Sequence, residues 1–478
     1  MNRQIVQLFG LSMILFALLV AFTSRWTVFE ADALKDPADP RGKSNKRELI
    51  AEQQVPRGLI KGRDGTVLAR SVPRGSGESR VFVRDYPEGE LFSHSVGYSY
   101  VQQGKTGLEA FQNDALTGRE NEFGTIFSDL QSEGREGRDL ITTLDTSAQR
   151  AAIQALGGQT GSVVAIEPQT GRVRVMATVP GFDPNGIGKQ QDQADVFNRA
   201  TQSTYPPGST FKVVTAAAAL DSGKFTPDSV VDGSSPRTIS GAPLANSGGA
   251  SFGAITLTEA LTNSVNTVWA QVGEQIGPKT LLDYMNRFGF NRDPELDYPD
   301  AQMRASGVRN AKLDLVDDTG GFDIGRVAIG QGGEEGTILV TPLQMALVAS
   351  AVGNGGELMR PRLTERIVGK DGRVEERLQP VEQSQVMKRE SAEQLAGMMN
   401  NVVNEGTGTA AALEGIDVAG KTGTAEVDNA TSNQAWFIGF APVRNPRMAV
   451  AVTIERTQGQ GGTDAAPIAK QVLQELLQ

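Results

Sequence analysis

A serine and a lysine three positions apart are the residues of this chain best suited to covalent chemistry. Ser209 and Lys212 follow the segment Tyr205 to Gly208 and open a run of helix-forming residues. Side chains three apart on a helix share a face, so this spacing places a nucleophile beside a possible base. The helix dipole at this end and partial burial both disfavour an ammonium ion, so Lys212 can be neutral and can accept the proton of Ser209.

Two more short motifs follow in chain order, Ser264-Val265-Asn266 and Lys421-Thr422-Gly423-Thr424. The serine and lysine alone are weak evidence, because a helix-starting serine and a solvated lysine explain them equally well. The ordered set of three is typical of active-site serine acyltransferases that react with penicillin. The candidate catalytic residues are therefore Ser209, Lys212, Ser264, Asn266 and Lys421.

This motif order resembles that of the penicillin-binding proteins and serine β-lactamases, and the resemblance extends into flanking sequence. It covers nearly everything after about Pro56. The matching segments in the N-terminal module are Arg57 to Ile60, Arg63 to Gly65 and Gly107 to Glu109. Those in the catalytic domain are Gly161 to Pro168, Pro180 to Asn185, Asn198 to Ala200, Gly330 to Gly332, Thr341 to Ala346 and Trp436 to Phe440.

The resemblance implies a role for each motif. Ser264 would relay a proton to the leaving amine, and Asn266 would hydrogen-bond both Lys212 and the substrate amide. Lys421 would add positive charge. Its neighbours Thr422, Gly423 and Thr424 would bind substrate: the two hydroxyls suit the terminal carboxylate of a D-alanine residue, and the glycine lets a ligand backbone approach closely. The backbone N–H groups of Ser209 and Thr424 would form the oxyanion hole.

Within this family, the sequence favours a monofunctional class B transpeptidase, most like the actinobacterial penicillin-binding protein A group. No room exists for a glycosyltransferase domain before about residue 150, and the E-x-x-L-N pattern of class A β-lactamases is not evident. Asn266 departs from the S-x-V pattern of class D enzymes. The alternatives are a D,D-carboxypeptidase, a serine β-lactamase-like hydrolase or sensor, and a non-catalytic scaffold of the wall-synthesis complex.

Composition excludes several other classes of site. The chain has no cysteine, which removes disulfides and thiolate chemistry, and a single histidine, His94, which excludes multi-histidine zinc sites. His94 lies far upstream of Ser209, so we expect a packed or surface residue and not a triad member. The net charge of -10 does not indicate the positively charged surface that nucleic-acid binding requires. We expect neither a metal nor a cofactor.

An uncharged apolar segment, 5–24, is long enough to cross about 30 Å of hydrocarbon as a helix. A cleaved signal peptide is the alternative, but the Ala31 to Ala33 cleavage-like pattern lies well beyond the apolar end. Flanking charges run against the positive-inside tendency, so an outward-facing catalytic domain rests on the family resemblance. We therefore expect a single-pass protein of the cytoplasmic membrane with an extracytoplasmic catalytic domain.

The expected organisation is a cytoplasmic tail (1–4), the membrane helix (5–24), a linker (25–55), an N-terminal module (56–150) of the pedestal or dimerisation type, and a transpeptidase domain (151–478). The resemblance implies an α/β (α+β) transpeptidase fold, with an antiparallel sheet flanked by helices and an all-helical subdomain. The implied ligands are stem peptides ending in D-Ala-D-Ala, and β-lactams. The implied protein partner is a RodA- or FtsW-type glycosyltransferase.

Overall fold

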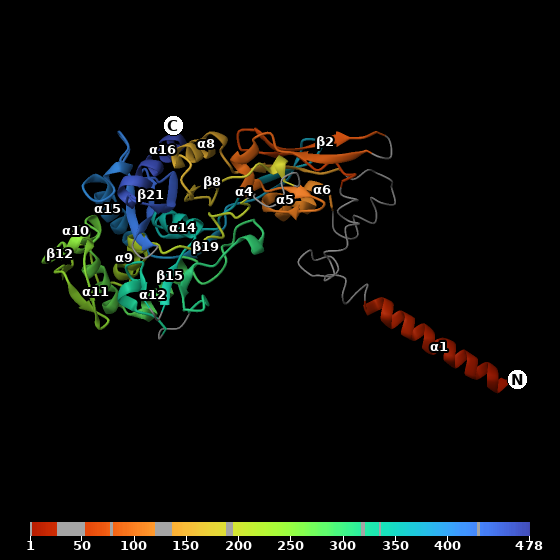
Figure 1. Cartoon of the computed structure of the whole chain (residues 1–478), viewed down its shortest axis with the longest axis horizontal. Helices are drawn as coiled ribbons and strands as arrows, with labels where there is room; N and C mark the ends of the chain where they lie inside the picture. Colours follow the sequence, from red (N-terminus) through yellow and green to blue (C-terminus); the bar gives the residue numbers. More distant parts are fainter. Residues whose placement is uncertain are drawn as a thin grey trace.

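The computed structural model describes residues 2–25, 53–76, 80–119, 136–187, 195–316, 321–333, 336–427 and 431–478. Most of the expected linker, including Ala31 to Ala33, lies outside these residues. The first helix, α1 (Asn2–Ser24), contains an apolar stretch, Val6–Ser24, long enough to cross a membrane. None of that stretch is buried inside the protein, and Figure 1 shows α1 apart from the folded body.

A five-stranded antiparallel sheet forms the centre of the catalytic domain, in the order β20-β21-β22-β7-β8. β7 is buried along its whole length. Strands covered on both faces carry continuous apolar runs instead of alternating ones, which explains the Val, Ala and Ile residues of β7. The strands are β7 (Gly161–Ile166), β8 (Val173–Val179), β20 (Ala419–Val427), β21 (Ser432–Ala441) and β22 (Met448–Thr457).

Helices cover both faces of this sheet. α8 (Thr146–Leu156) and α16 (Ala466–Leu477) pack side by side on one face, and α14 (Pro342–Gly353) packs against the other (Figure 1). The Thr341 hydroxyl accepts the Gln344 N–H and a proline occupies the first turn, both of which favour a helix start at α14. α14 is apolar all round because it is buried all round.

The three sequence motifs lie where the sheet meets a helical lobe built around α9 (Lys212–Asp221), which is buried from Lys212 to Leu220. The lobe also carries small antiparallel sheets, so it is less purely helical than expected. Its other helices are α10 (Leu257–Thr262), α11 (Asn266–Ile276), α12 (Pro278–Arg287), α13 (Ile324–Val327) and α15 (Arg389–Asn404). Its strands are β9 (Val230–Asp232), β10 (Arg237–Ile239), β11 (Ala242–Leu244), β12 (Ala254–Thr256), β13 (Gly307–Arg309), β14 (Gly332–Gly333) and β15 (Gly336–Leu339).

The N-terminal module contains a six-stranded sheet in the order β18-β17-β6-β1-β2-β3. Two of its strands come from much later in the sequence. β17 (Thr364–Val368) pairs antiparallel with β6 (Asp139–Thr142) and with β18 (Val374–Arg377). Residues that follow Ser209 in the chain therefore complete this sheet, and a domain boundary at residue 150 does not predict this pairing. The remaining strands are β1 (Ile60–Lys61), β2 (Val67–Arg74) and β3 (Val81–Asp85).

Several expected elements are confirmed and two are wrong. The sequence predicts helices from Thr146 to about Leu156 and from Ala466 to Leu477, and α8 and α16 have these bounds. The sequence also predicts one short helix from Gly107 to Leu116, but the structure breaks it into α5 (Gly107–Phe111) and α6 (Asn113–Thr117). The apolar stretch from Ala254 to Leu261 predicts a helix, but its first three residues form strand β12. The Thr256 hydroxyl then forms a capping box with Glu259 and starts α10. Other short elements are α4 (Ser93–Val96), β4 (Ser99–Tyr100), β5 (Gly104–Lys105), β16 (Glu357–Met359) and β19 (Glu382–Gln385).

Candidate active site

Ser209 lies in a 3₁₀ turn, η6 (Gly208–Phe211), that runs directly into α9 at Lys212. Neither segment is capped by a side chain, so the Ser209 hydroxyl is not used as a helix cap. Ser209 is half-buried, whereas Thr210, Phe211 and Lys212 are buried. The turn therefore leaves the serine at the border with solvent and places the lysine in the interior.

Two glycines allow the serine turn to pack closely against its neighbours. Gly208 has a φ of 51°, and a Cβ there would lie 2.7 Å from the carbonyl oxygen of Thr424. Gly330 has a φ of 77°, and a Cβ there would lie 1.8 Å from the carbonyl oxygen of Gly208. The Gly330 carbonyl in turn accepts the Gly208 N–H at 3.0 Å. Only glycine satisfies both the backbone conformation and the close approach at these positions.

The Lys212 amine is bound by neutral oxygen atoms. Its Nζ donates to the Ser264 carbonyl and to Asn266 Oδ1, both at 2.7 Å, and lies 3.3 Å from Ser264 Oγ. The two carbonyl-type acceptors account for both hydrogens of a neutral amine. Burial and, to a smaller extent, the charge of Lys421 hold the pKa of Lys212 well below its ordinary value. A neutral amine retains the lone pair that proton acceptance requires.

The second motif lies at the junction of two helices. The family resemblance implies a loop for both residues; Ser264 lies between α10 and α11, but Asn266 is the first residue of α11. Ser264 has a φ of 57°, a costly conformation for a residue with a Cβ and one found at functional sites. The Ser264 Oγ lies within hydrogen-bond distance of both Lys212 Nζ, at 3.3 Å, and Lys421 Nζ, at 2.9 Å. This hydroxyl connects the two lysines.

Lys421 is fully buried on β20, the edge strand of the sheet. Its Nζ donates to Ser264 Oγ and to the Thr422 carbonyl, both at 2.9 Å. Burial lowers the pKa of Lys421 to about 7. We expected a fixed positive charge here; instead, the charge of Lys421 depends on pH near neutrality.

The two threonines of the third motif alternate with Lys421 and Gly423 along β20, so they share one side of the strand. Thr422 Oγ1 is buried and lies 2.6 Å from Thr407 Oγ1. Thr424 Oγ1 is partly exposed and accepts the Gly461 N–H at 3.2 Å, which leaves its own proton for a ligand.

Gly423 is required by packing within the protein. A Cβ at this position would lie 2.7 Å from the Pro207 carbonyl oxygen and 2.9 Å from Thr210 Cγ2. The bare Cα thus makes room for the serine turn, whereas we expected it to face a ligand. A Cβ on Gly208 would also lie 3.2 Å from the Thr424 nitrogen, so the serine turn and β20 are in close contact.

Two aromatic residues, Tyr205 and Trp436, stabilise the backbone just before the serine turn. Trp436 Nε1 donates to the Pro206 carbonyl at 3.0 Å, and the Trp436 ring packs edge-on against Tyr205 with centroids 6.2 Å apart. The Tyr205 hydroxyl donates to Glu455 at 2.5 Å, and Arg199 Nε donates to the same carboxylate oxygen at 3.1 Å. An aromatic residue in an apolar strand is expected to pack in the core, and Trp436 is fully buried; it also hydrogen-bonds the backbone just before Ser209.

Sequence reasoning missed the residues that support the motifs from a distance. Thr407 and Gly461 contact the hydroxyls of the third motif, and Asn246 contacts the first turn of α11. The glycine pair at 461 and 462 was a visible signal of close packing. The other two residues carry no local signal.

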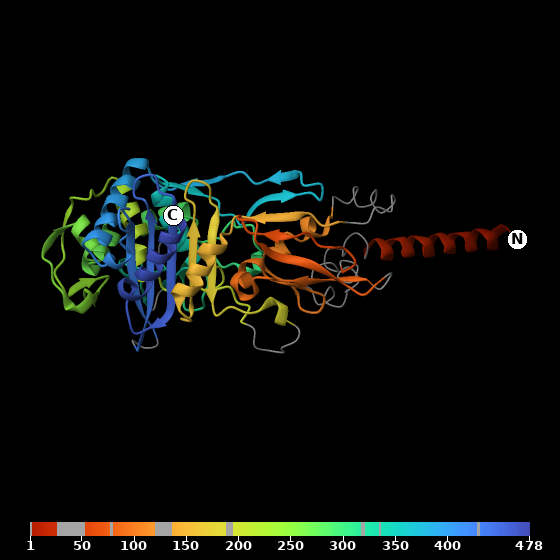
Figure 2. The ribbon, with the colours of Figure 1, turned by 90° about the horizontal axis from the view of Figure 1, so that it is seen from above.

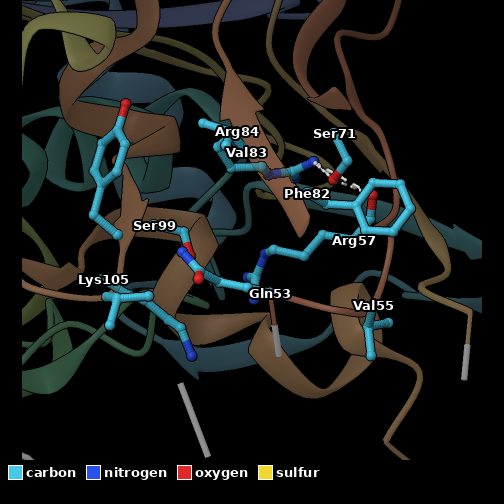
Figure 3. A pocket seen from close by; sticks show the side chains of 11 residues that line it. Gln53, Val55, Arg57, Ser71, Phe82, Val83, Arg84, Ser99 and Lys105 are labelled. Carbon is cyan, nitrogen blue, oxygen red and sulfur yellow. Dashed lines mark hydrogen bonds between the residues drawn. The ribbon is translucent and has the colours of Figure 1, made fainter. Parts of the chain in front are cut away.

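A hollow in the N-terminal module lies away from these motifs. Figure 3 shows Gln53, Val55, Arg57, Ser71, Phe82, Val83, Arg84, Ser99 and Lys105 around it. Two of these lining residues are bound to Glu109, which accepts hydrogen bonds from Arg57 at 2.9 Å and from Arg84 at 2.6 Å. All three residues are buried. Burial alone would raise the pKa of Glu109, but the two arginines more than offset this and hold it below its usual value. The Arg57 and Glu109 motifs thus meet in a buried ion cluster.

His94 is packed, as expected. Its Nε2 lies 3.1 Å from the Pro180 carbonyl oxygen, and its ring meets Phe182 edge-on at 5.1 Å. Burial lowers the pKa of His94. Across the described ranges of the chain, no group of three or more acidic or histidine side chains is placed to hold a metal ion.

Comparison with family models gives two matches that together span most of the chain. Residues 161–474 match the penicillin binding protein transpeptidase domain, and residues 57–138 match the penicillin binding protein A dimerisation domain.

Known relatives are similar over their whole length. The peptidoglycan D,D-transpeptidase PbpA of Mycolicibacterium smegmatis is 34% identical over 98% of this chain and 98% of that protein. Its namesake in Mycobacterium tuberculosis is 32% identical over 100% of this chain and 99% of that protein. The structure of M. tuberculosis penicillin-binding protein A as a ceftriaxone acyl-enzyme complex is 30% identical, has a TM-score of 0.78, and covers 90% of this chain and 100% of that one.

Proposed function

Since the chain belongs to the penicillin-binding protein transpeptidases, we propose that it cross-links peptidoglycan stem peptides as a monofunctional class B D,D-transpeptidase, with Ser209 as the nucleophile. The observation that carries this assignment of roles is the hydrogen-bonded path from Lys212 through Ser264 to Lys421 beside the serine turn. The same nucleophile would be acylated by β-lactam antibiotics.

In the first half-reaction, Lys212 accepts the Ser209 proton while Oγ attacks the carbonyl carbon of the penultimate D-alanine. The backbone N–H groups of Ser209 and Thr424 stabilise the oxyanion, a contribution of about 3 to 4 kcal/mol per donor in similar sites. The C–N bond then breaks, and the proton reaches the departing D-alanine nitrogen from Lys212 through Ser264. The products are free D-alanine and an acyl-enzyme ester.

In the second half-reaction, the amine of a neighbouring stem peptide attacks the ester carbonyl. Its proton leaves along the same path, Ser209 recovers a proton, and a new amide bond joins the two strands. During both steps Lys421 and Thr424, with its free hydroxyl proton, would hold the terminal carboxylate of the donor peptide. Asn266 would hold both Lys212 and the substrate amide.

The membrane topology and the partner follow from the same assignment. α1 would anchor the protein in the cytoplasmic membrane as its single span, with residues 56–150 as a pedestal and residues 151–478 as the extracytoplasmic catalytic domain. A monofunctional transpeptidase needs glycan strands made by another enzyme, and a RodA- or FtsW-type glycosyltransferase would supply them.

The lifetime of the acyl-enzyme tests this function. We expect intact-protein mass spectrometry of the detergent-solubilised chain to show one benzylpenicillin adduct per molecule, lasting many minutes, and no adduct on Ser209→Ala. Adduct turnover within seconds would favour a β-lactamase-like hydrolase, and failure of the wild-type protein to form any adduct would favour a non-catalytic scaffold. Transfer to an added amine, as opposed to water, separates the transpeptidase from a D,D-carboxypeptidase.

A further inference from the structure

Asn246 is buried 20 residues before Asn266, the first residue of α11, and among the described residues its side chain makes no hydrogen bond to a candidate catalytic side chain. We propose that it is a positioning residue: it holds the peptide group between Ala245 and itself so that Asn266 turns its oxygen, and not its NH₂ group, toward Lys212. This inference rests on the proposed role of Lys212 as the proton acceptor.

The Asn246 side chain is 5% exposed and fully hydrogen-bonded. Its Nδ2 donates to the Gly233 carbonyl at 3.1 Å and to the Ala250 carbonyl at 2.9 Å. Its Oδ1 accepts the Thr267 N–H at 2.9 Å. One amide thus joins the end of β9, the segment after β11 and the first turn of α11, all in the lobe farthest from the N-terminal module (Figure 1).

The bond to Thr267 also caps α11. Val265, the residue that precedes this helix, makes no side-chain cap, so Asn246 supplies from elsewhere in the sequence the acceptor that a helix start requires. The position of Asn266 at the start of α11 therefore depends on Asn246.

The peptide group between Ala245 and Asn246 is bound at both ends. Its N–H donates to Ser235 Oγ at 3.0 Å, and its carbonyl accepts from Asn266 Nδ2 at 3.2 Å. Because a carbonyl can only accept, it fixes the Asn266 amide with Nδ2 toward Ala245 and Oδ1 toward Lys212, 2.7 Å away.

The orientation of this amide decides whether Lys212 can act as a base. In the observed orientation, Asn266 Oδ1 accepts a hydrogen from the amine and leaves its lone pair free. In the opposite orientation, the NH₂ group of Asn266 would donate into that lone pair and compete with the Ser209 proton. The Ala245 carbonyl excludes the opposite orientation, and Asn246 with Ser235 holds that carbonyl in place.

The first test compares the rate constant of acylation by a fluorescent penicillin in the full-length protein. Asn246→Ala removes all three side-chain bonds, whereas Asn246→Asp keeps the acceptor for Thr267 and loses both donors. We expect both to slow the acylation step by about tenfold to a hundredfold, with a smaller change in the dissociation constant of the penicillin. Ser235→Ala should give an intermediate loss, and Ser247→Ala, exposed on the same loop, should acylate at the wild-type rate.

Melting temperatures of the same samples show which variants are folded. If Asn246→Ala does not fold, the comparison of Ser235→Ala with the wild type still tests the proposal. If Asn246→Asp acylated at the wild-type rate, capping of α11 would be the whole role of Asn246 and the proposal would be wrong.

The second test asks whether Asn246 acts through the Asn266 amide. Asn266→Asp has a carboxylate with no N–H, so rotation cannot turn a donor toward Lys212. On this background, we expect Asn246→Ala to slow acylation by less than about threefold, a clear departure from additivity. If Asn246→Ala slowed acylation as much on the Asn266→Asp background as in the wild-type protein, the proposal would be wrong. Failure of the proposed function itself gives a different result, namely a wild-type protein that is not acylated or is acylated in Ser209→Ala.

Discussion

The N-terminal module and the candidate active site each bury two basic side chains, but with different partners. In the N-terminal module, Arg57 and Arg84 share the carboxylate of Glu109, and the three side chains are 7%, 2% and 0% exposed. In the active site, Lys212 and Lys421 are fully buried, and their hydrogen-bond partners are hydroxyl, amide and carbonyl oxygens.

This difference separates a structural cluster from a reactive one. A carboxylate offsets the cost of burying a guanidinium, and removal of either partner leaves an uncompensated charge. Neutral oxygens do not offset that cost for an ammonium, so the pKa of Lys212 falls well below its ordinary value and the pKa of Lys421 falls to about 7. The chemistry of each cluster therefore depends on whether an acidic residue is within reach.

The largest effect is expected from removing the amine. Lys212→Met keeps most of the side-chain volume and should slow acylation by about 10² to 10⁴, the usual cost of losing a general base. Because the wild-type amine is buried and has no acidic partner among the residues that the structure describes, the melting temperature should change little. Stopped-flow acylation and calorimetry on the same sample check both parts. Acylation at the wild-type rate would require a different base.

The opposite result is expected in the N-terminal module. Glu109→Gln removes the carboxylate that the two buried arginines share and should lower the free energy of unfolding by about 3 to 5 kcal/mol, while folded molecules acylate at the wild-type rate. Since the pKa of Glu109 is lowered in the folded protein, its stabilisation is complete above the unfolded pKa of about 4.3 and is lost as the pH falls through the folded pKa. Denaturant titrations should therefore show a large difference in the free energy of unfolding between variant and wild type at neutral pH, and a small one at acidic pH.

A matched control lies in the same module. Arg70 and Asp85 form a 2.6 Å ion pair on β2 and β3, but their side chains are 55% and 35% exposed. Arg70→Gln should therefore cost less than about 1 kcal/mol. Equal losses for Arg70→Gln and Glu109→Gln would show that burial is not what distinguishes the cluster.

A smaller effect on the rate of acylation is expected from introducing an acidic partner for Lys212. Asn266→Asp places a carboxylate beside Lys212, so the pKa of Lys212 should rise and the neutral fraction of the amine should fall. We expect acylation near neutral pH to slow by about tenfold, with recovery at more alkaline pH. A loss that is independent of pH would indicate that the amide NH₂ group of Asn266, and not the charge state of Lys212, is what matters.

Local patterns predicted much of this structure. The three motifs, the helices at Thr146 and Ala466, and the edge strand at Lys421 all depend on residues close together in sequence. The return of β17 to pair with β6 depends on contacts more than 200 residues apart, which no local pattern encodes. The cap that Asn246 provides to α11 and the contact of Gly461 with Thr424 were missed for the same reason.

The pH dependence of acylation is the most direct test of the central claim that Lys212 is neutral and acts as the base. The claim predicts that the rate constant for formation of the Ser209 acyl-enzyme, followed from pH 5 to pH 11, rises through a pKa well below the ordinary lysine value of about 10.4 and then levels off. A rate that keeps rising until about pH 10.4 would show that Lys212 is an ordinary ammonium ion and would contradict the claim.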